Sequence, residues 1–203
     1  MAIRLATAKI VGASPYSQSR KTLTLKEDRE TSDVHERRTW RERMHTDTPP
    51  DPETGEVRGN VVIPPMALKN CLDQAASSLG LTVPGRGKKG YGKVFEAGVL
   101  CMDPIVLGVK AEDVQPEELF VPSDGRRGGG SRVTKLFPHI PEGQWGGEAK
   151  FTVLDDLISE DVFERVLHHA GQLVGLGRFR PQTRGFYGRF KVEGKIRWQE
   201  VKT

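Results

Sequence analysis

Two segments of this chain carry apolar residues at helical spacing, and they restrict its possible folds more than any other feature. In the first, apolar residues recur every three or four positions, Pro65 suits the first turn and Gly80 follows as a typical helix stop. In the second, Ser159 is a good N-cap just before the apolar stripe begins. The two patterns predict helices over residues 65–79 and 160–174.

Shorter segments with apolar and polar residues in alternation, or with apolar runs, surround these helices. Strands are predicted within residues 2–12, 95–108, 132–140, 145–156 and 185–201, the last broken by a turn at Glu193–Gly194. The order strand, helix, strands, helix, strand is typical of an α+β, ferredoxin-like (RRM-like) βαββαβ arrangement. We expect one domain over residues 1–203.

Two long polar segments interrupt this pattern. Residues 14–60 contain few aliphatic side chains, and Thr54–Gly55 suits a turn, so we expect an inserted arm or thumb-like hairpin between the first strand and the first helix. Residues 109–131 are rich in glycine and polar residues toward their end, and they are predicted to be a mobile loop.

Composition assigns the chain to a broad class of proteins but does not identify a ligand. Its 203 residues, 36% of them hydrophobic, suffice for one fair-sized domain, and the formal net charge of +4 is only mildly basic. Cys71 and Cys101 stand in apolar surroundings, so we expect buried thiols and a reducing, cytoplasmic setting. We find neither a signal-peptide pattern nor an apolar run of membrane-spanning length, and we expect no membrane partner.

Motifs for metals and cofactors are missing from the sequence. His168 and His169 are adjacent on a predicted helix and point about 100° apart, and no C-x-x-C or H-x-x-x-H pattern occurs. No P-loop and no complete dinucleotide fingerprint follows a strand. We therefore expect no metal and no cofactor.

Acid–base cleavage of RNA remains an open alternative, because it needs only a His or Tyr and a cation beside a bent phosphate. His35 and His45 lie among arginines in the arm, and Asp33 could support a metal-assisted cleavage. A solvated surface role is the simpler interpretation of each.

Basic residues gather around aromatic residues in three places, and residues 177–203 carry eight Lys or Arg residues and two Glu residues. The first cluster surrounds Trp40 with Arg37, Arg38, Arg41 and Arg43, the second surrounds Tyr91 with Lys88, Lys89 and Lys93, and the third places Arg178, Arg180, Arg184 and Arg189 beside Phe179, Phe186 and Tyr187. This composition is typical of single-strand recognition, for RNA or DNA alike. A solvated charged surface is the alternative for the first two clusters.

Glycines distinguish the third cluster. No packing role for them is evident from the sequence, so we expect Gly175 and Gly177 to let backbone N–H groups approach a phosphate. Phe186 and Phe190 are predicted to share a strand face and to belong to the core, and Tyr187 could face either way.

The segment "GLGRFRPQTRGFYGRF", directly after the last predicted helix, resembles the glycine-rich loop of the RAMP superfamily of CRISPR-associated proteins. "IPPMALKNCLDQAA", residues 63–76, is similar to the start of the first helix in backbone subunits of RNA-guided surveillance complexes. Pro65 and Met66 replace the small residues of that motif, and the chain is short for such a subunit. A short, divergent or phage-borne member, including a mimic, would fit these departures.

The resemblance implies a non-catalytic, self-assembling protein of antiviral defence that coats a guide RNA together with other effector subunits. Its RNA-contacting positions would be Gly175, Gly177, Arg178 and Arg180, with Lys69 and Asn70 near a phosphate. Residues 33–58 would either intercalate or contact a neighbouring copy. Two alternatives remain: a RAMP-like endoribonuclease, and an interaction protein whose basic segments bind an acidic partner or a sister subunit.

Overall fold

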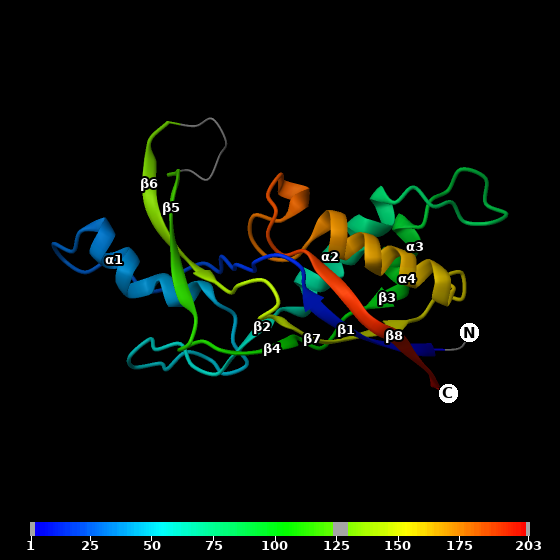
Figure 1. Ribbon diagram of the computed structural model, residues 1–203, viewed down its shortest axis with the longest axis horizontal. Coiled ribbons are helices and arrows are strands. Elements are labelled where there is room, and N and C mark those ends of the chain that lie inside the picture. Colours follow the sequence, from blue (N-terminus) through cyan, green and yellow to red (C-terminus); the bar gives the residue numbers. More distant parts are fainter. Residues whose placement is uncertain (1–2, 124–129, 202–203) are drawn as a thin grey trace.

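A four-stranded antiparallel sheet forms the base of the molecule. The structure is a computed structural model that describes residues 3–123 and 130–201. The sheet has the strand order β3-β7-β1-β8 (Figure 1), with β1 (Ile3–Gly12), β3 (Val99–Leu100), β7 (Gly146–Val153) and β8 (Phe190–Val201). Ala6 lies opposite Phe151 on one side and Trp198 on the other, so the sheet places these three side chains on one face.

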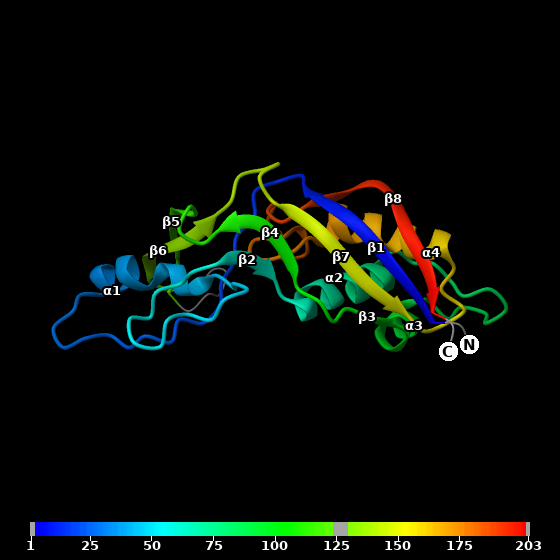
Figure 2. The ribbon, with the colours of Figure 1, turned by 90° about the horizontal axis from the view of Figure 1, so that it is seen from below.

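Two helices cover that face, and Figure 2 shows the opposite face without a helix over it. They are α2 (Pro65–Ser78) and α4 (Glu160–His169), the second continued by a π-helical turn, η2 (Ala170–Val174). Ser159 caps α4 by accepting a hydrogen bond from the N–H of Val162. Leu72 and Phe163 are fully buried against the sheet, so the apolar stripes form the core.

The remaining elements extend the molecule away from this layer. They are α1 (Ser32–Thr39), η1 (Trp40–Arg43), β2 (Asn60–Ile63), α3 (Gly92–Gly98), β4 (Ile105–Lys110), β5 (Gln115–Pro122) and β6 (Arg132–His139), followed by η3 (Pro181–Thr183). β2 pairs with β4, and β5 pairs with β6 in a hairpin. In Figure 1 this hairpin stands upright between α1 and the helical layer.

The predicted α+β class with antiparallel strands is confirmed, as are the helices at 65–78 and 160–174. The prediction of strands alone over 95–108 is wrong, because Phe95 and Gly98 belong to α3 and only β3 and the start of β4 are extended. A short apolar run does not distinguish a buried strand from a helical turn.

The predicted turn at Glu193–Gly194 is also wrong, because β8 runs unbroken from Phe190 to Val201. Its pairing with β1 shifts register between Thr7 and Lys9, opposite Gly194, whose φ is +73°. A glycine in this conformation accommodates a bulge within a strand as well as a turn between strands.

The two polar segments contain more regular structure than predicted. In the arm, Thr31 caps α1 by accepting a hydrogen bond from the N–H of Val34. In the segment 109–131, residues 115–122 form β5 rather than a loop, because their alternating side chains pair with β6. The glycine-rich end of that predicted loop, residues 124–129, lies outside the described residues. None of the helices described is both long and apolar enough to cross a lipid bilayer.

Candidate nucleic-acid interface

The glycine-rich segment 175–189, named here the basic loop, is bound tightly to the chain that follows β1. Gly188 donates its N–H to the carbonyl of Pro15 at 2.7 Å, and Arg178 donates its N–H to the carbonyl of Ser17 at 2.8 Å. Within the loop, the N–H of Leu176 donates to the carbonyl of Gly188 at 2.9 Å. These main-chain bonds fix the loop against residues 13–17.

Its glycines therefore have a packing role, contrary to the prediction. A Cβ at Gly177 would stand 2.3 Å from the carbonyl oxygen of Ser17, and a Cβ at Gly188 would stand 1.8 Å from that of Leu176. Both glycines have positive φ, +73° and +71°. The N–H of Gly175, expected to face a phosphate, donates to the carbonyl of Ala170 at 2.8 Å.

Arg178 is the basic-loop cation that lies deepest. Its guanidinium carbon is 3.5 Å from the ring centroid of Phe137 in β6 and 4.4 Å from that of Phe179. Nη1 donates to the hydroxyl of Ser19 at 3.2 Å, and Nε is buried with no hydrogen-bond partner. Burial, and then the nearby charge of Arg43, lower the pKa of Arg178 to about 10, although the charge of Glu36 acts in the opposite direction.

The carboxylate beside Arg178 is already fully engaged. Glu36 accepts two hydrogen bonds from Arg43, at 2.7 and 2.9 Å, one from the N–H of Leu136 at 2.8 Å and one from Lys135 at 3.4 Å. Burial alone would raise the pKa of Glu36, but these contacts outweigh it and lower that pKa.

We name Glu36, Arg43, Lys135, Phe137 and Arg178 the junction. Within it, Arg43 and Lys135 contact the Glu36 carboxylate, and Arg178 lies close enough for its pKa to respond to the charges of Arg43 and Glu36. Three cations of the described residues therefore lie near one carboxylate. A partly buried site with this imbalance favours a further anion, because desolvated positive charge is costly without a partner.

A second set of contacts ties the basic loop to the hairpin. The hydroxyl of Tyr187 donates to the carboxylate of Glu117, with oxygens at 2.7 and 2.9 Å, and Nδ1 of His139 lies 3.5 Å from the same carboxylate. Burial, followed by the hydrogen bond to Glu117 and the charge of that carboxylate, raises the pKa of Tyr187. The rings of Phe137 and Phe179 meet edge to face at 5.9 Å. Loop and hairpin thus form one rigid corner.

Phe186 is exposed on this corner rather than buried, so the prediction that it belongs to the core is wrong. Its side chain is 57% exposed, whereas Phe190 is buried as predicted. The two do not share a strand face because β8 begins only at Phe190. Arg184 and Arg189 are also exposed, and Nε of Arg180 donates to the side chain of Gln182 at 3.2 Å.

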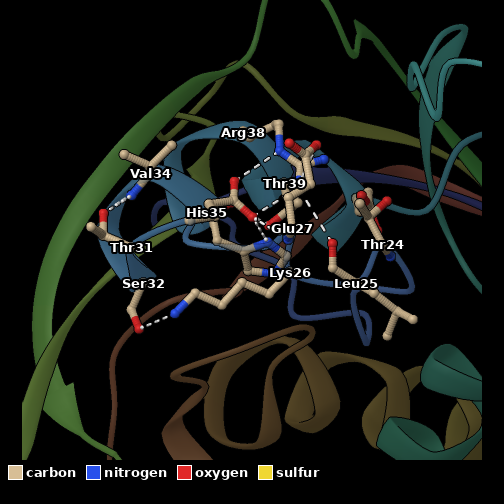
Figure 3. A network of polar contacts seen from close by, with 12 residues as sticks. Thr24, Leu25, Lys26, Glu27, Thr31, Ser32, Val34, His35, Arg38 and Thr39 are labelled. Atoms are coloured by element: carbon tan, nitrogen blue, oxygen red, sulfur yellow. Dashed lines mark hydrogen bonds and ion pairs between the residues drawn. The ribbon is translucent and has the colours of Figure 1, made fainter.

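Several arginines of the arm pair with carboxylates of the chain, as Figure 3 shows for Arg38. Arg38 donates to both carboxylate oxygens of Glu30 at 3.0 Å and lies 3.3 Å from Glu27. The hydrogen bond from Arg38 is the main reason that the pKa of Glu30 falls to about 2. His35 contacts the same carboxylate at 3.2 Å.

The other members of this cluster also have partners in the chain. Arg37 lies 3.5 Å from Glu118 of the hairpin, and Arg43 is buried in its pair with Glu36. Trp40 is buried, and Arg41 covers its ring at 4.4 Å. We refer to Arg37, Arg38, Trp40, Arg41 and Arg43 as the arm cluster.

The remaining predicted residues lie elsewhere. Lys88 and Lys89 are exposed in the loop 82–90, which Figure 1 places at the end of the molecule opposite α1. Lys93 pairs with Glu96 at 2.7 Å. Lys69 is buried, pairs with Asp73 and donates to the carbonyl of Phe95 at 3.1 Å, whereas Asn70 is exposed. The three basic clusters therefore do not form one surface.

The candidate catalytic residues of the arm show no shared arrangement. Asp33 is exposed in the first turn of α1, and His35 contacts Glu30. Burial, and then the charge of Arg20, lowers the pKa of His45. Within residues 3–123 and 130–201, no three His, Cys, Asp or Glu side chains gather closely enough to hold a metal ion.

The sequence prediction did not include the residues that the hairpin contributes to the site. Glu117 lies in a segment that the sequence predicts to be a loop, whereas Lys135 and Phe137 lie in a predicted strand, and nothing in the prediction joins the two. The short runs rich in β-branched and aromatic residues at 119–121 and 133–137, separated by a glycine-rich segment, are the signal that could have paired them.

Comparisons with known proteins give structural neighbours only. No family model matches the chain, and no curated protein matches it. Over 97% of its length it is similar to 61% of a chain in "Cryo-EM structure of the Type III-B Cmr-beta bound to cognate target RNA", with 12% identity and a TM-score of 0.48. It spans 61% of the length of that first neighbour.

Two further solved structures are similar. "Crystal structure of Cmr6 from Pyrococcus furiosus" matches over 95% of this chain and 100% of that one, with 13% identity and a TM-score of 0.48. "CRISPR RNA-guided surveillance complex" matches over 92% and 66%, with 11% identity and a TM-score of 0.36. At these scores the solved structures say nothing of what this chain binds, so the function proposed next rests on its own residues.

Proposed function

We propose that this protein binds single-stranded RNA at the corner between the basic loop and the β5–β6 hairpin, as a non-catalytic subunit of an RNA-guided, CRISPR-type effector complex. The junction carries this proposal. There Arg178, Arg43 and Lys135 lie near a single carboxylate that already accepts hydrogen bonds from two of them. A phosphate of the RNA backbone would supply the missing negative charge.

Pre-organisation supports this assignment. The guanidinium of Arg178 is held between two aromatic rings, and its main chain is fixed to Ser17, so little conformational freedom remains to be lost on binding. Three further arginines, Arg180, Arg184 and Arg189, follow in a loop without any acidic residue. A single strand that passes over this loop would meet cations at successive phosphates.

The fold fits the same proposal. We propose that β1, α2, β3, β7, α4 and β8 form a ferredoxin-like core, because their chain order and the spatial order β3-β7-β1-β8 agree with a split βαβ arrangement. Residues 14–60 would then be an insertion that reaches a neighbouring copy along the RNA. Leu23 and Leu25, both exposed in this segment, would supply apolar contact area.

A salt titration tests the proposal. Arg178→Ala with Arg180→Ala should weaken binding of a single-stranded RNA and reduce the slope of log K against log salt by about 0.7 per lost phosphate contact. Lys88→Ala with Lys89→Ala also removes two positive charges, from the loop 82–90 at the end of the molecule opposite α1, and is the control. An unchanged affinity and slope in the first variant, or an equal loss in the second, contradicts the proposal.

The two alternatives are separated by simpler assays. Labelled RNA incubated with the protein, with and without divalent metal, should remain intact, whereas cleavage lost on His45→Ala would favour an endoribonuclease. A protein that purifies without excess absorbance at 260 nm and shifts neither RNA nor single-stranded DNA would favour an acidic protein partner.

A further inference from the structure

Phe186 is a large apolar side chain that the fold holds in solvent, with 57% of its surface exposed. It lies toward the end of the basic loop, next to Tyr187, whose hydroxyl is bonded to Glu117 of the hairpin. An isolated exposed apolar residue needs no explanation by itself, so its setting decides what it does.

The main chain on both sides of Phe186 is fixed. Gly185 donates its N–H to the carbonyl of Arg180 at 3.1 Å, and Tyr187 donates its N–H to the carbonyl of Phe179 at 3.0 Å. The Tyr187 ring lies edge-on to the Phe186 ring at 4.6 Å and is itself anchored to Glu117. The exposed ring is therefore presented rigidly, at little entropic cost to a ligand.

The surroundings are cationic and partly apolar. Arg184 and Arg189 are exposed on the same loop, and residues 175–189 contain no Asp or Glu. Glu117 and Phe137 lie on the face of the hairpin that contacts the loop, and every second residue farther along β5 and β6 lies on the same face. Its next members are the half-buried residues Leu119, Val121, Val133 and Lys135. In Figure 1 the hairpin and the basic loop project to the same side of the molecule.

We propose that Phe186 stacks on an unpaired base of the bound RNA, so that the site selects strands with accessible bases over duplexes and over other polyanions. This inference rests on the proposed function and specifies its substrate class. Ring stacking is available to every base because each has a π face. A duplex covers those faces, and a polyphosphate has none, so both would bind through the cations alone.

The binding of two strands to three proteins, the wild type, Phe186→Ala and Phe186→Tyr, tests the inference. The strands are an oligouridine and an abasic ribose-phosphate oligomer of equal length, which share their phosphates but not their bases. The wild type should bind oligouridine roughly five- to a hundredfold more tightly than the abasic strand. Phe186→Ala should bind both strands as weakly as the wild type binds the abasic one, with the salt slope unchanged, and Phe186→Tyr should keep the preference.

The outcomes are distinguishable. The stacking inference is overturned, while the proposed function stands, if Phe186→Ala retains the preference for oligouridine. The same holds if Phe186→Ala lowers the affinity for both strands by the same factor. If the wild type binds neither strand, the proposed function fails and the inference fails with it. Because Phe186 is exposed, equal thermal unfolding midpoints for the wild type and Phe186→Ala are expected and confirm that the variant is folded.

Discussion

The arm cluster and the basic loop have nearly the same composition, arginines beside aromatic residues, yet the fold uses them in opposite ways. In the arm cluster, Trp40 is buried and Arg43 is paired with Glu36 inside the molecule. In the basic loop, Phe186 is exposed, and Arg178 is held beside another cation. One cluster stabilises the chain, and the other presents charge and a ring to solvent.

Carboxylates account for the difference. Residues 24–43 contain six acidic and six basic residues, and Arg38 and Arg43 pair with carboxylates of this segment, Glu30 and Glu36. Residues 175–192 contain four arginines, one lysine and no acidic residue. A count of cations and aromatics alone cannot separate the two clusters, whereas the count of interleaved acids does.

The largest expected effect concerns the buried pair of the arm cluster. Arg43→Ala should lower the free energy of unfolding by about 3 to 5 kcal/mol, because it leaves the Glu36 carboxylate buried with fewer partners. Urea denaturation measures this, with Arg41→Ala as the exposed control at about 1 kcal/mol or less. A loss below about 1 kcal/mol for Arg43→Ala would show that this arginine does not stabilise the buried carboxylate of Glu36.

The basic-loop glycines come next. Gly177→Ala should cost roughly 2 to 4 kcal/mol of unfolding free energy, from its positive φ and the close carbonyl of Ser17. Gly143→Ala is a matched control with nearly the same φ, +72° against +73°, and no atom within 4 Å of the added Cβ. Its cost should be about 1 kcal/mol. Equal losses would show that the loop is not packed against residues 13–17.

Acid should weaken the junction selectively. The pKa of Glu36 is lowered in the folded state from its usual 4.5, so its stabilising contribution is complete above that value and is lost as the pH falls through the lowered pKa. Glu36→Gln should therefore flatten the fall of unfolding free energy below about pH 4.5. Chemical denaturation across this pH range measures the effect. An unchanged pH dependence would show that the Glu36 carboxylate is not paired with Arg43.

The smallest effect is expected at the surface of the arm. Arg37 and Glu118 are both exposed, so Arg37→Ala should change the unfolding free energy by less than about 0.5 kcal/mol. Calorimetry gives that value, and an RNA titration of the same variant should match the wild type. A weaker affinity for RNA would extend the binding surface to the arm cluster.

Local patterns were enough to predict the elements that carry their own signal. The stripes of α2 and α4 and the alternation of β1 and β7 appear in the sequence because each buries one continuous face. α1 has no such stripe and depends on contacts from distant residues, such as that of Glu36 with the N–H of Leu136. Gly194 allows both a turn and a bulge, and only the pairing with β1 decides between them.

The sequence indicates which charged residues belong to the candidate site, but it does not indicate how they are arranged. Arg178 was named from its loop, but Phe137 and Lys135, which complete the junction, come from a strand some forty residues earlier in the chain. Phe186 was assigned to the core because the sequence does not show where β8 begins.

The central claim is that Arg178 of the basic loop, and not the exposed Arg41 of the arm cluster, binds a phosphate of RNA. Arg178 and Arg41 are a matched pair, since each guanidinium lies over an aromatic ring. The salt dependence of RNA binding for Arg178→Gln and Arg41→Gln tests the claim most directly. We predict a weaker affinity and a slope reduced by about 0.7 for Arg178→Gln, with wild-type values for Arg41→Gln. Equal effects, or an effect of Arg41→Gln alone, would contradict it.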